Sequence, residues 1–241
     1  MSAKLIPVSE IFLAVQGEGL QIGVPTVFIR TGGCDFRCSW CDSMYAVDPK
    51  HRNTWRMMDP AAIMAEVTRV AGRPLLVTLS GGNPAIHDQL EEVVRIGHGK
   101  GFTFTMETQG SHYRPWMNAL DFICVSPKPP SSGMASKFDR DTFTRFVEGF
   151  GPTVSVKIVV FNPEDFEWAL GVRKLCNPSR VRFYLQVGNT DVAADAPHET
   201  LVMRSLHHLQ TLQNIVLDRK LYDITVLPQL HALIHGNQRG V

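Results

Sequence analysis

The chain has no long hydrophobic run and no strong charge of either sign. None of its 241 residues form an apolar stretch long enough to cross a bilayer, and the segment after Met1 lacks the apolar core of a signal peptide. We therefore expect no membrane partner. The formal net charge is only +1, so bulk electrostatics give no indication of a nucleic-acid partner.

Cysteine is scarce as well. There are five cysteines, an odd number, and three of them lie within eight residues, which disfavours the disulfide framework of a secreted protein. We therefore expect a reduced, cytoplasmic location. Cys124 and Cys176 stand in apolar segments, and each is predicted to be a small core residue.

The other three cysteines form a compact motif. Cys34, Cys38 and Cys41 have the spacing C-x3-C-x2-C, which lets three thiolates converge on one centre. A structural zinc site and a closed iron–sulfur cubane both take four protein ligands, and no fourth cysteine is near. Three thiolates would hold three irons of a [4Fe–4S] cluster and leave the fourth iron open. The alternatives are a zinc loop with a distant fourth ligand and three incidental cysteines.

The rest of the chain predicts one α/β domain over residues 1–241. Hydrophobic residues make up 44% of the sequence and charged residues 20%, as in ordinary globular proteins. Short apolar runs predict strands at Thr26–Arg30, Leu75–Leu79, Phe102–Glu107, Phe122–Ser126, Thr153–Val160, Arg182–Val187 and Tyr222–Leu227. Helical patterns follow Asp59-Pro60 and Leu90, cover Asp141–Gly149 and Glu164–Cys176, and include Leu209, Leu212 and Val216. This alternation predicts a mainly parallel sheet and a partial (β/α) barrel.

Polar motifs follow several of these strands, at the barrel edge where such folds carry their sites. In Ser80-Gly81-Gly82-Asn83-Pro84 the two glycines let backbone approach a ligand, although a tight turn would use the same residues. Glu107 is a candidate proton-transfer group or a solvated loop acid. Lys128 is a candidate partner for a carboxylate or a solvated surface charge. The segment 186–189 has amides suited to a ribose or adenine edge, or forms a turn.

Two of these motifs resemble the radical S-adenosylmethionine (SAM) enzymes. The cysteine spacing, with Trp40 just before Cys41, is similar to their signature, and Ser80–Pro84 resembles their GGE-type motif with Asn83 in place of the glutamate. The resemblance implies that SAM binds the open iron. It also implies that an electron from the cluster generates a 5′-deoxyadenosyl radical.

Further blocks resemble one family, 7-carboxy-7-deazaguanine synthase. They are Val15–Gly19, Arg30, Cys34–Ser43, Ser80–Pro84, Glu107–Gly110, Ser126–Pro130, Leu227–His231, Gly236-Asn237 and Arg239–Val241. The resemblance implies conversion of 6-carboxy-5,6,7,8-tetrahydropterin to 7-carboxy-7-deazaguanine with loss of ammonia, a step toward queuosine and other deazapurines. It also implies a homodimer, magnesium dependence and an electron donor such as flavodoxin or ferredoxin.

The same resemblance implies roles for individual residues. The expected substrate contacts are Val15, Gln16, Gly17, Arg30, Ser80 and Val241. The expected SAM contacts are Trp40, Cys41, Asp42, Gly82, Ser126, Pro127, Lys128, Gln186, Val187, Gly188 and Asn189. Ser43 matches a magnesium ligand, and Ser43, Glu107 and His231 are the candidate catalytic residues. Taken alone, Ser43 would be a helix cap, Arg30 a strand-end salt bridge and Val241 a frayed terminus.

Two other functional classes stay open. One is a radical SAM activase that makes a glycyl radical on a partner protein. The other is a non-enzymatic metal module that stores an electron or braces a zinc loop. Neither class explains the tail from Leu227 to Val241.

Overall fold

The protein is built on one curved sheet. The computed structural model describes residues 5–149, 154–189, 192 and 197–241. Its strands are β1 (Ile6–Val15), β2 (Pro25–Thr31), β3 (Arg56–Met58), β4 (Leu76–Gly81), β5 (Thr103–Thr108), β6 (Phe122–Val125), β7 (Val154–Val160), β8 (Arg182–Val187) and β9 (Ile224–Leu227). They pair in the order β3-β1-β2-β4-β5-β6-β7-β8-β9.

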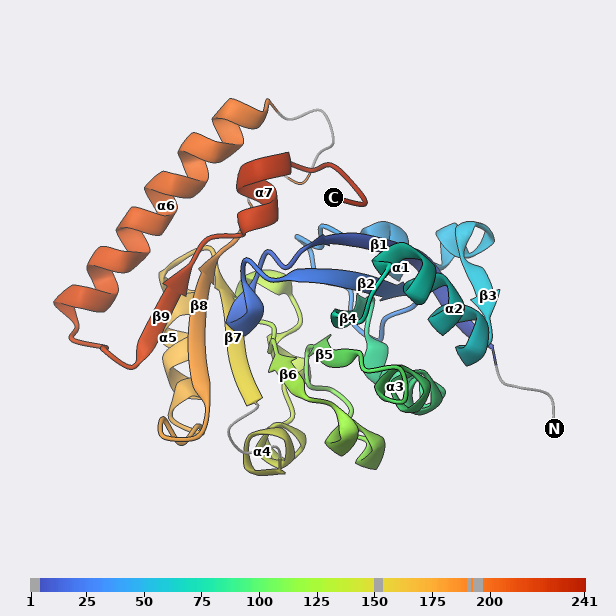
Figure 1. Cartoon of the computed structure of the whole chain (residues 1–241). Coiled ribbons are helices and arrows are strands. Elements are labelled where there is room, and N and C mark those ends of the chain that lie inside the picture. Colours follow the sequence, from blue (N-terminus) through green and yellow to red (C-terminus); the bar gives the residue numbers. More distant parts are fainter. Residues whose placement is uncertain (1–4, 150–153, 190–191, 193–196) are drawn as a thin grey trace.

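Helices cover the outer side of this sheet (Figure 1). They are α1 (Met44–Val47), α2 (Pro60–Ala71), α3 (Leu90–His98), α4 (Arg140–Gly149), α5 (Pro163–Arg173), α6 (His198–Asp218) and α7 (Leu230–His235). Short 3₁₀ helices are η1 (Gly19–Gln21), η2 (Pro49–Thr54), η3 (Pro84–Ile86), η4 (Pro115–Ala119), η5 (Pro130–Ser132) and η6 (Ala135–Lys137). Figure 1 shows α2 to α6 around the outside of the arc, whereas α1 and α7 lie at its open side.

The sheet is mainly parallel, as predicted. Each neighbouring pair from β2 through β4 to β9 is parallel, and only β1 runs antiparallel, to both β2 and β3. The sheet is open, because β3 and β9 are its two edge strands, so the architecture is the predicted partial barrel. Parallel strands place their carboxyl ends at one edge, where the loops that follow them meet.

Local sequence signals account for several boundaries. Asp59 caps α2 by accepting a hydrogen bond of 2.8 Å from the backbone N–H of Ala62, and Pro60 occupies the first helical position. The helix ends at Ala71, and the capping residue Gly72 has a φ of +68°, which is strained for other residues. Its apolar face buries Ile63 and Val67 completely. This helix therefore forms where the sequence predicted it.

The structure also contains elements that the sequence pattern did not predict. β1 was missed because its pattern is irregular: Ile6 and Val8 are fully buried, whereas Leu13 and Val15 are about half exposed. The helix predicted to reach Cys176 ends at Arg173, and the last strand begins at Ile224 rather than Tyr222. Thr153, the predicted start of β7, lies outside the described residues.

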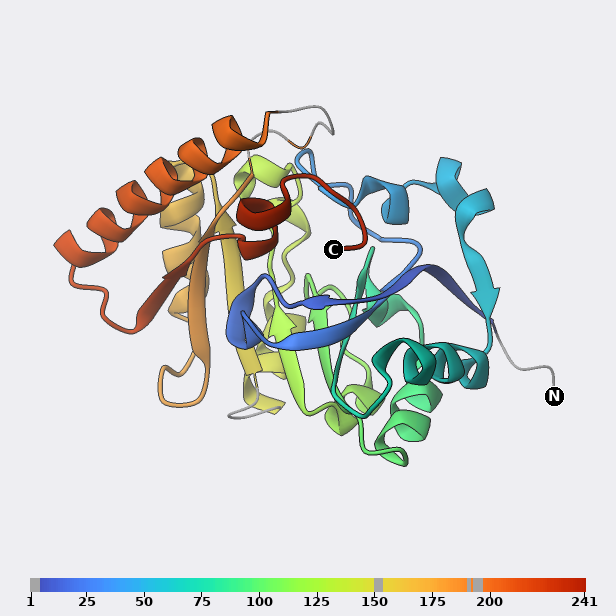
Figure 2. The same ribbon diagram turned by 45° about the horizontal axis from the view of Figure 1, so that its top comes forward.

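The carboxyl-terminal segment returns to the open side of the sheet. After α7 it runs back toward β1 and α1, as the two views together show (Figures 1 and 2). The tail, the cysteine loop and the carboxyl ends of the parallel strands thus enclose a common space.

In the described part of the chain, no helix combines the length and apolar character needed to span a membrane.

Candidate active site

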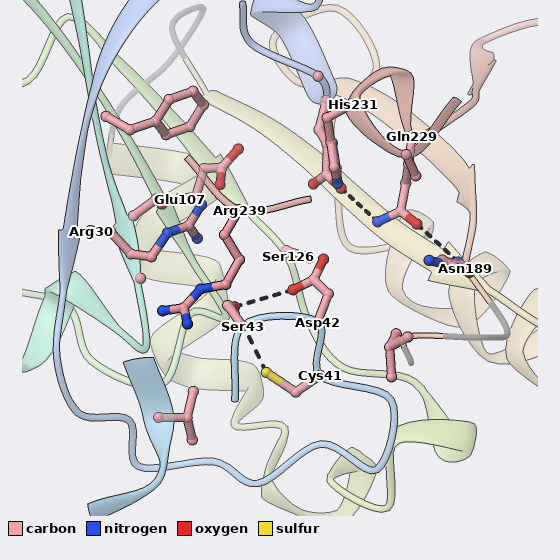
Figure 3. Close-up of a pocket in the computed structure, with 18 of the residues that line it drawn as sticks. Arg30, Cys41, Asp42, Ser43, Glu107, Ser126, Asn189, Gln229, His231 and Arg239 are labelled. Carbon is pink, nitrogen blue, oxygen red and sulfur yellow. Dashed lines mark hydrogen bonds between the residues drawn. The ribbon is translucent and has the colours of Figure 1, made fainter. Parts of the chain in front are cut away.

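The enclosed space is a cavity of about 250 Å³. Most residues singled out in the sequence line it: Val15, Gln16, Gly17, Arg30, Cys34, Cys38, Trp40, Cys41, Asp42, Ser43, Ser80, Gly82, Glu107, Ser126, Lys128, Asn189, His231 and Val241. Figure 3 shows part of this lining, with Arg30 and Glu107 on one side and Gln229 and His231 on another. Residues more than 200 positions apart in the chain therefore meet around one cavity.

The cysteine loop contributes three free thiols to the cavity. Burial raises the pKa of each thiol, and that of Cys34 reaches about 11. The backbone N–H of Phe36 lies 3.4 Å from Cys34 Sγ. Metal binding would release these protons, because the thiolate is the form of cysteine that binds a metal.

The donor set fits an iron–sulfur cluster. Among the described residues, no three His, Cys, Asp or Glu side chains already stand together as a complete metal site. Three soft sulfur donors on one short loop nevertheless suit iron–sulfur chemistry, and the cavity in front of them leaves room for a further ligand.

The glycine motif after β4 fits directly against the cysteine loop. The N–H of Gly82 donates to Thr31 O at 3.1 Å, and that of Asn83 donates to Gly33 O at 2.9 Å. A Cβ atom at Gly82 would overlap the carbonyl oxygen of Gly33. Glycine is thus required for contact between the two loops, in addition to any approach to a ligand.

Asn83 ties three loops together. Its side chain is fully buried, donates to Asp35 Oδ1 at 2.8 Å and to Ser111 Oγ at 3.0 Å, and accepts from Thr108 Oγ1 at 2.8 Å. Gln109 Nε2 donates to the same Asp35 oxygen at 2.7 Å. A glutamate at position 83 would bring a carboxylate against that of Asp35, so the amide is the complementary group here.

The opposite side of the cavity carries a second polar group of residues. Gln16 Nε2 donates to Glu107 Oε1 at 3.2 Å. Burial raises the pKa of Glu107, while the positive charges of Arg30 and Lys128 act in the other direction. Arg30 Nε pairs with Glu10 at 3.2 Å, and its guanidinium lies 5.5 Å from the centre of the Phe12 ring. A guanidinium has five donors, so this pair leaves capacity for a second anion.

Ser43 stands between the cysteine loop and α1. It occupies the N-cap position of α1 but makes no capping hydrogen bond with its side chain. Its hydroxyl donates instead to Asp42 Oδ1 at 3.1 Å and lies 3.8 Å from Cys41 Sγ (Figure 3). The hydroxyl and the neighbouring carboxylate are hard oxygen donors of the kind that magnesium prefers.

The tail supplies the remaining wall. His231 packs against Gly17, where a Cβ atom would collide with the imidazole. Burial lowers the pKa of His231, so the ring is neutral near pH 7. The Arg239 guanidinium lies 3.4 Å from the centre of the Tyr45 ring and 3.4 Å from Glu10 Oε1. The tail is thereby held over the cavity by a cation–π contact and an ion pair.

Comparison with known proteins identifies the family of this site. Residues 28–123 match the Radical SAM superfamily. The chain is 41% identical over 245 residues to the 7-carboxy-7-deazaguanine synthase of Bacillus subtilis, with 99% of this chain and all of that relative covered. This chain belongs to the 7-carboxy-7-deazaguanine synthase family.

Two further similarities agree with that assignment. The 7-carboxy-7-deazaguanine synthase of Bacillus cereus is 40% identical over 240 residues, covering 98% of this chain and 99% of the relative. The crystal structure of QueE from Escherichia coli superposes with a TM-score of 0.63 at 25% identity, covering 83% of this chain and 91% of that chain. The radical SAM resemblance and the α/β fold predicted from the sequence are thus confirmed.

Four of the residues predicted from the synthase family do not line the main cavity: Pro127, Gln186, Val187 and Gly188. Gln186 is fully buried in β8, where its Nε2 donates to Pro228 O at 3.0 Å. Gly188 borders a small hollow beside the cavity, together with Trp40, Asp42 and Asn189. The SAM contacts expected of these four residues remain predictions, as do the ligand contacts expected of the residues that line the cavity.

Lys128 makes a different contact from the one suggested by its sequence position. Its Nζ donates to Ser126 Oγ at 3.1 Å and lies 5.7 Å from the centre of the Trp40 ring. Among the described residues Lys128 forms no ion pair with a carboxylate, and pairing with the carboxylate of a ligand remains a prediction. This arrangement keeps a positive charge at the cavity, close to the cysteine loop.

The cavity lining also includes Glu18, Lys157 and Gln229, to which the sequence interpretation gave no individual role, although Glu18 and Gln229 lie in motifs that it quoted. One signal was available, because Lys157 is the single charged residue in the strand Val154–Val160, where every residue is buried. A lysine in such a strand needs a partner. Its partner, Glu18, is 139 residues away and no local pattern indicates it.

Proposed function

We propose that this chain catalyses the radical SAM ring contraction of 6-carboxy-5,6,7,8-tetrahydropterin to 7-carboxy-7-deazaguanine with release of ammonia, a step in queuosine and deazapurine biosynthesis. The observation that carries the proposal is the single cavity joining the three-cysteine loop to Arg30 and the tail. The full-length similarity to the synthase of Bacillus subtilis supports it.

The cofactor side of the cavity suits a cluster and SAM. Cys34, Cys38 and Cys41 would hold a [4Fe–4S] cluster, which together with SAM supplies the radical chemistry when both are bound. Gly82 offers backbone beside the cysteine loop, and Asp42 and Asn189 offer polar groups near it. The protein's own part is to orient the reactants and exclude water.

The opposite side suits a carboxylated pterin. Arg30 is placed to pair with the substrate carboxylate, because a guanidinium donates two parallel hydrogen bonds to such a group. Gln16 and Glu107 present an amide and a carboxyl group for the amino-pyrimidine edge, and the Val241 carboxylate lines the same cavity. The neutral His231 imidazole is suited to accept a proton there.

Magnesium is part of the proposal. Ser43 would provide one ligand, since Mg²⁺ is usually bound by few protein oxygens together with substrate oxygens and water. We expect Ser43→Ala to lower turnover about tenfold or more and to weaken its dependence on magnesium concentration, with cluster absorbance unchanged. Ser39→Ala, in the same loop, is the control. An unchanged magnesium dependence in Ser43→Ala would remove Ser43 from this role.

The remaining parts of the proposal follow from the family. We propose a homodimer in the cytoplasm that receives electrons from a donor such as flavodoxin or ferredoxin. Its tests are sedimentation of the purified protein and reduction of the cluster by each donor.

The decisive experiment is an anaerobic assay of cluster-loaded protein with SAM, reductant, magnesium and 6-carboxy-5,6,7,8-tetrahydropterin, analysed by mass spectrometry. We expect 7-carboxy-7-deazaguanine. Formation of 5′-deoxyadenosine without deazaguanine would retain radical SAM chemistry and reject this substrate, as for an activase. Neither product from an intact cluster would favour an electron-storing module.

A further inference from the structure

A buried ion pair lies at the cavity outside the residues assigned above. Lys157 projects from β7 with its side chain 6% exposed, and its Nζ pairs with Glu18 Oε2, whose side chain is 13% exposed. Burial lowers the pKa of Lys157 to about 7. Removing two charges from water is costly, and a pair of this kind is retained only with further hydrogen bonds.

Those further bonds come from the tail. The second Glu18 oxygen, Oε1, accepts a hydrogen bond of 2.8 Å from Gln229 Nε2. Gln229 Oε1 in turn accepts one of 2.9 Å from the backbone N–H of Asn189, drawn in Figure 3. The ion pair and these two hydrogen bonds form a continuous path. It runs from Lys157 in β7 through Glu18, between β1 and β2, and Gln229 in the tail to Asn189, just after β8.

The path joins the two proposed binding regions. Glu18 directly follows Gln16 and Gly17, the proposed pterin contacts, and its backbone N–H donates to Gln16 Oε1 at 3.2 Å. The carbonyl of Gly17 also accepts from Leu230 N at 3.0 Å, next to His231. Asn189 lies at the other end, among the proposed SAM contacts. A ligand that orders the segment at Asn189 or the loop at Gln16 and Gly17 therefore restricts the same hydrogen bonds.

We propose that the Glu18–Lys157 pair, bridged by Gln229, is a positioning element that couples pterin binding to SAM binding. This inference rests on the proposed function. SAM fixes the segment at Asn189. The Gln229 side chain, bonded to both Asn189 and Glu18, restrains Glu18 in turn. The adjoining loop of Gln16 and Gly17 is then held in the conformation that binds the pterin. By linkage, each ligand strengthens binding of the other by the same factor.

The test is equilibrium binding of 6-carboxypterin, a fluorescent and unreactive probe, to cluster-loaded protein with and without SAM. We expect SAM to tighten binding of this probe about tenfold in the unmodified protein, within the usual range of coupling between sites. Glu18→Gln and Gln229→Leu should reduce that factor to about one. Gln229→Leu leaves the ion pair intact, so it tests the path with less risk to folding.

Two controls separate positioning from stability. Glu66→Gln breaks the Arg56–Glu66 pair, neither member of which lines the cavity, and should leave the coupling factor unchanged. The double variant Glu18→Gln/Lys157→Met removes both buried charges, so it should regain thermal stability but not coupling. Recovery of coupling in the double variant, its persistence in Gln229→Leu, or its absence from the unmodified protein would overturn the inference. Failure of the unmodified protein to bind the probe at all would instead count against the proposed function.

Discussion

The two walls of the cavity are held by different kinds of interaction. In the cysteine wall, formed by residues 34–43, 80–83 and 108–111, the amides of Asn83 and Gln109 converge on one Asp35 oxygen. In the tail wall, formed by residues 15–18, Arg30, Glu107, Lys157 and residues 229–241, two ion pairs accompany the hydrogen bonds: Lys157 pairs with Glu18, and Arg239 pairs with Glu10. The first wall is held by amide hydrogen bonds to a carboxylate, and the second by hydrogen bonds together with ion pairs.

The difference suits the role that the proposed function gives to each wall. Iron–sulfur ligands must keep one geometry, and buried amide hydrogen bonds with good geometry fix a loop in one arrangement. A wall that closes over a substrate must accept charged groups and release them. Charged side chains on a terminal segment, such as Arg239 with its side chain 56% exposed, suit that task.

The largest effect is expected from breaking the cysteine wall at its ligands. Cys38→Ala should prevent formation of a normal cluster and lower product formation below detection, because two thiolates do not hold it. Iron and sulfide analysis with visible absorbance measures the first result. Cys176→Ala, a partly buried thiol away from the cavity, is the matched control and should keep the cluster. A full iron content in Cys38→Ala would contradict the assignment.

The tail side should respond through substrate binding instead. Arg30→Ala should lower kcat/KM about 100-fold, because it removes the partner of the substrate carboxylate and leaves Glu10 with fewer paired charges. Arg30→Lys keeps the charge without the two-pronged donor and should recover part of the loss. Steady-state assays measure both variants, with cluster content as the control. A normal KM in Arg30→Ala would mean that the substrate carboxylate binds elsewhere.

Asn83 tests how the cysteine wall is fixed. Asn83→Asp keeps the shape but places a second carboxylate beside Asp35, so the free energy of unfolding should fall by about 2–3 kcal/mol. Asn118→Asp, on an exposed position, should change it by less than about 0.5 kcal/mol. Urea unfolding of the cluster-free proteins gives both values. Equal effects of the two substitutions would show that the amide network contributes little.

The smallest expected effect is on the pH dependence of stability, and it involves one histidine near each wall. Burial lowers the pKa of His87, which bonds Gly32 O near the cysteine loop, and that of His231 in the tail. The unfolded chain then takes up protons near pH 6.5 that the folded chain does not, so stability falls as the pH falls below about 6.5. His87→Gln and His231→Gln should each flatten this decline by up to about 1 kcal/mol per pH unit. Unfolding at pH 7.5 and 5.5 measures it, and an unchanged slope in both variants would contradict these shifts.

The cysteine wall was the more predictable from sequence. Its ligands lie within eight residues, and the strands on either side carry strong apolar patterns, so their relative positions follow from local signals. The role of Asn83, which fixes the cysteine loop, was harder to predict from the sequence. Asn83 differs from the usual glutamate of its motif, and only the meeting of three loops explains why an amide is suited to that position.

The resemblance indicated residues 15–17, 231 and 241 of the tail wall, but the contacts that hold this wall together depended on tertiary structure. Gln229 and Glu18 are 211 residues apart, and Glu18 and Lys157 are 139 apart, so no periodicity connects them. The strand β1, which places this loop, was missed because its pairing with β2 outweighs an irregular pattern of burial. Nonlocal contacts of this kind are set by the fold, and the spacing of residues in the sequence does not predict them.

The parallel order of the strands also has a practical consequence. Because the cavity lies at the carboxyl ends of β2 and β4 to β9, the connections that lead into these strands lie at the opposite edge of the sheet. The exposed segments 72–74 and 177–180 are two of them. A fluorophore, affinity tag or surface tether attached there would leave the mouth of the cavity open. The enzyme can accordingly be immobilised through the edge of the sheet opposite the cavity for work under an oxygen-free atmosphere.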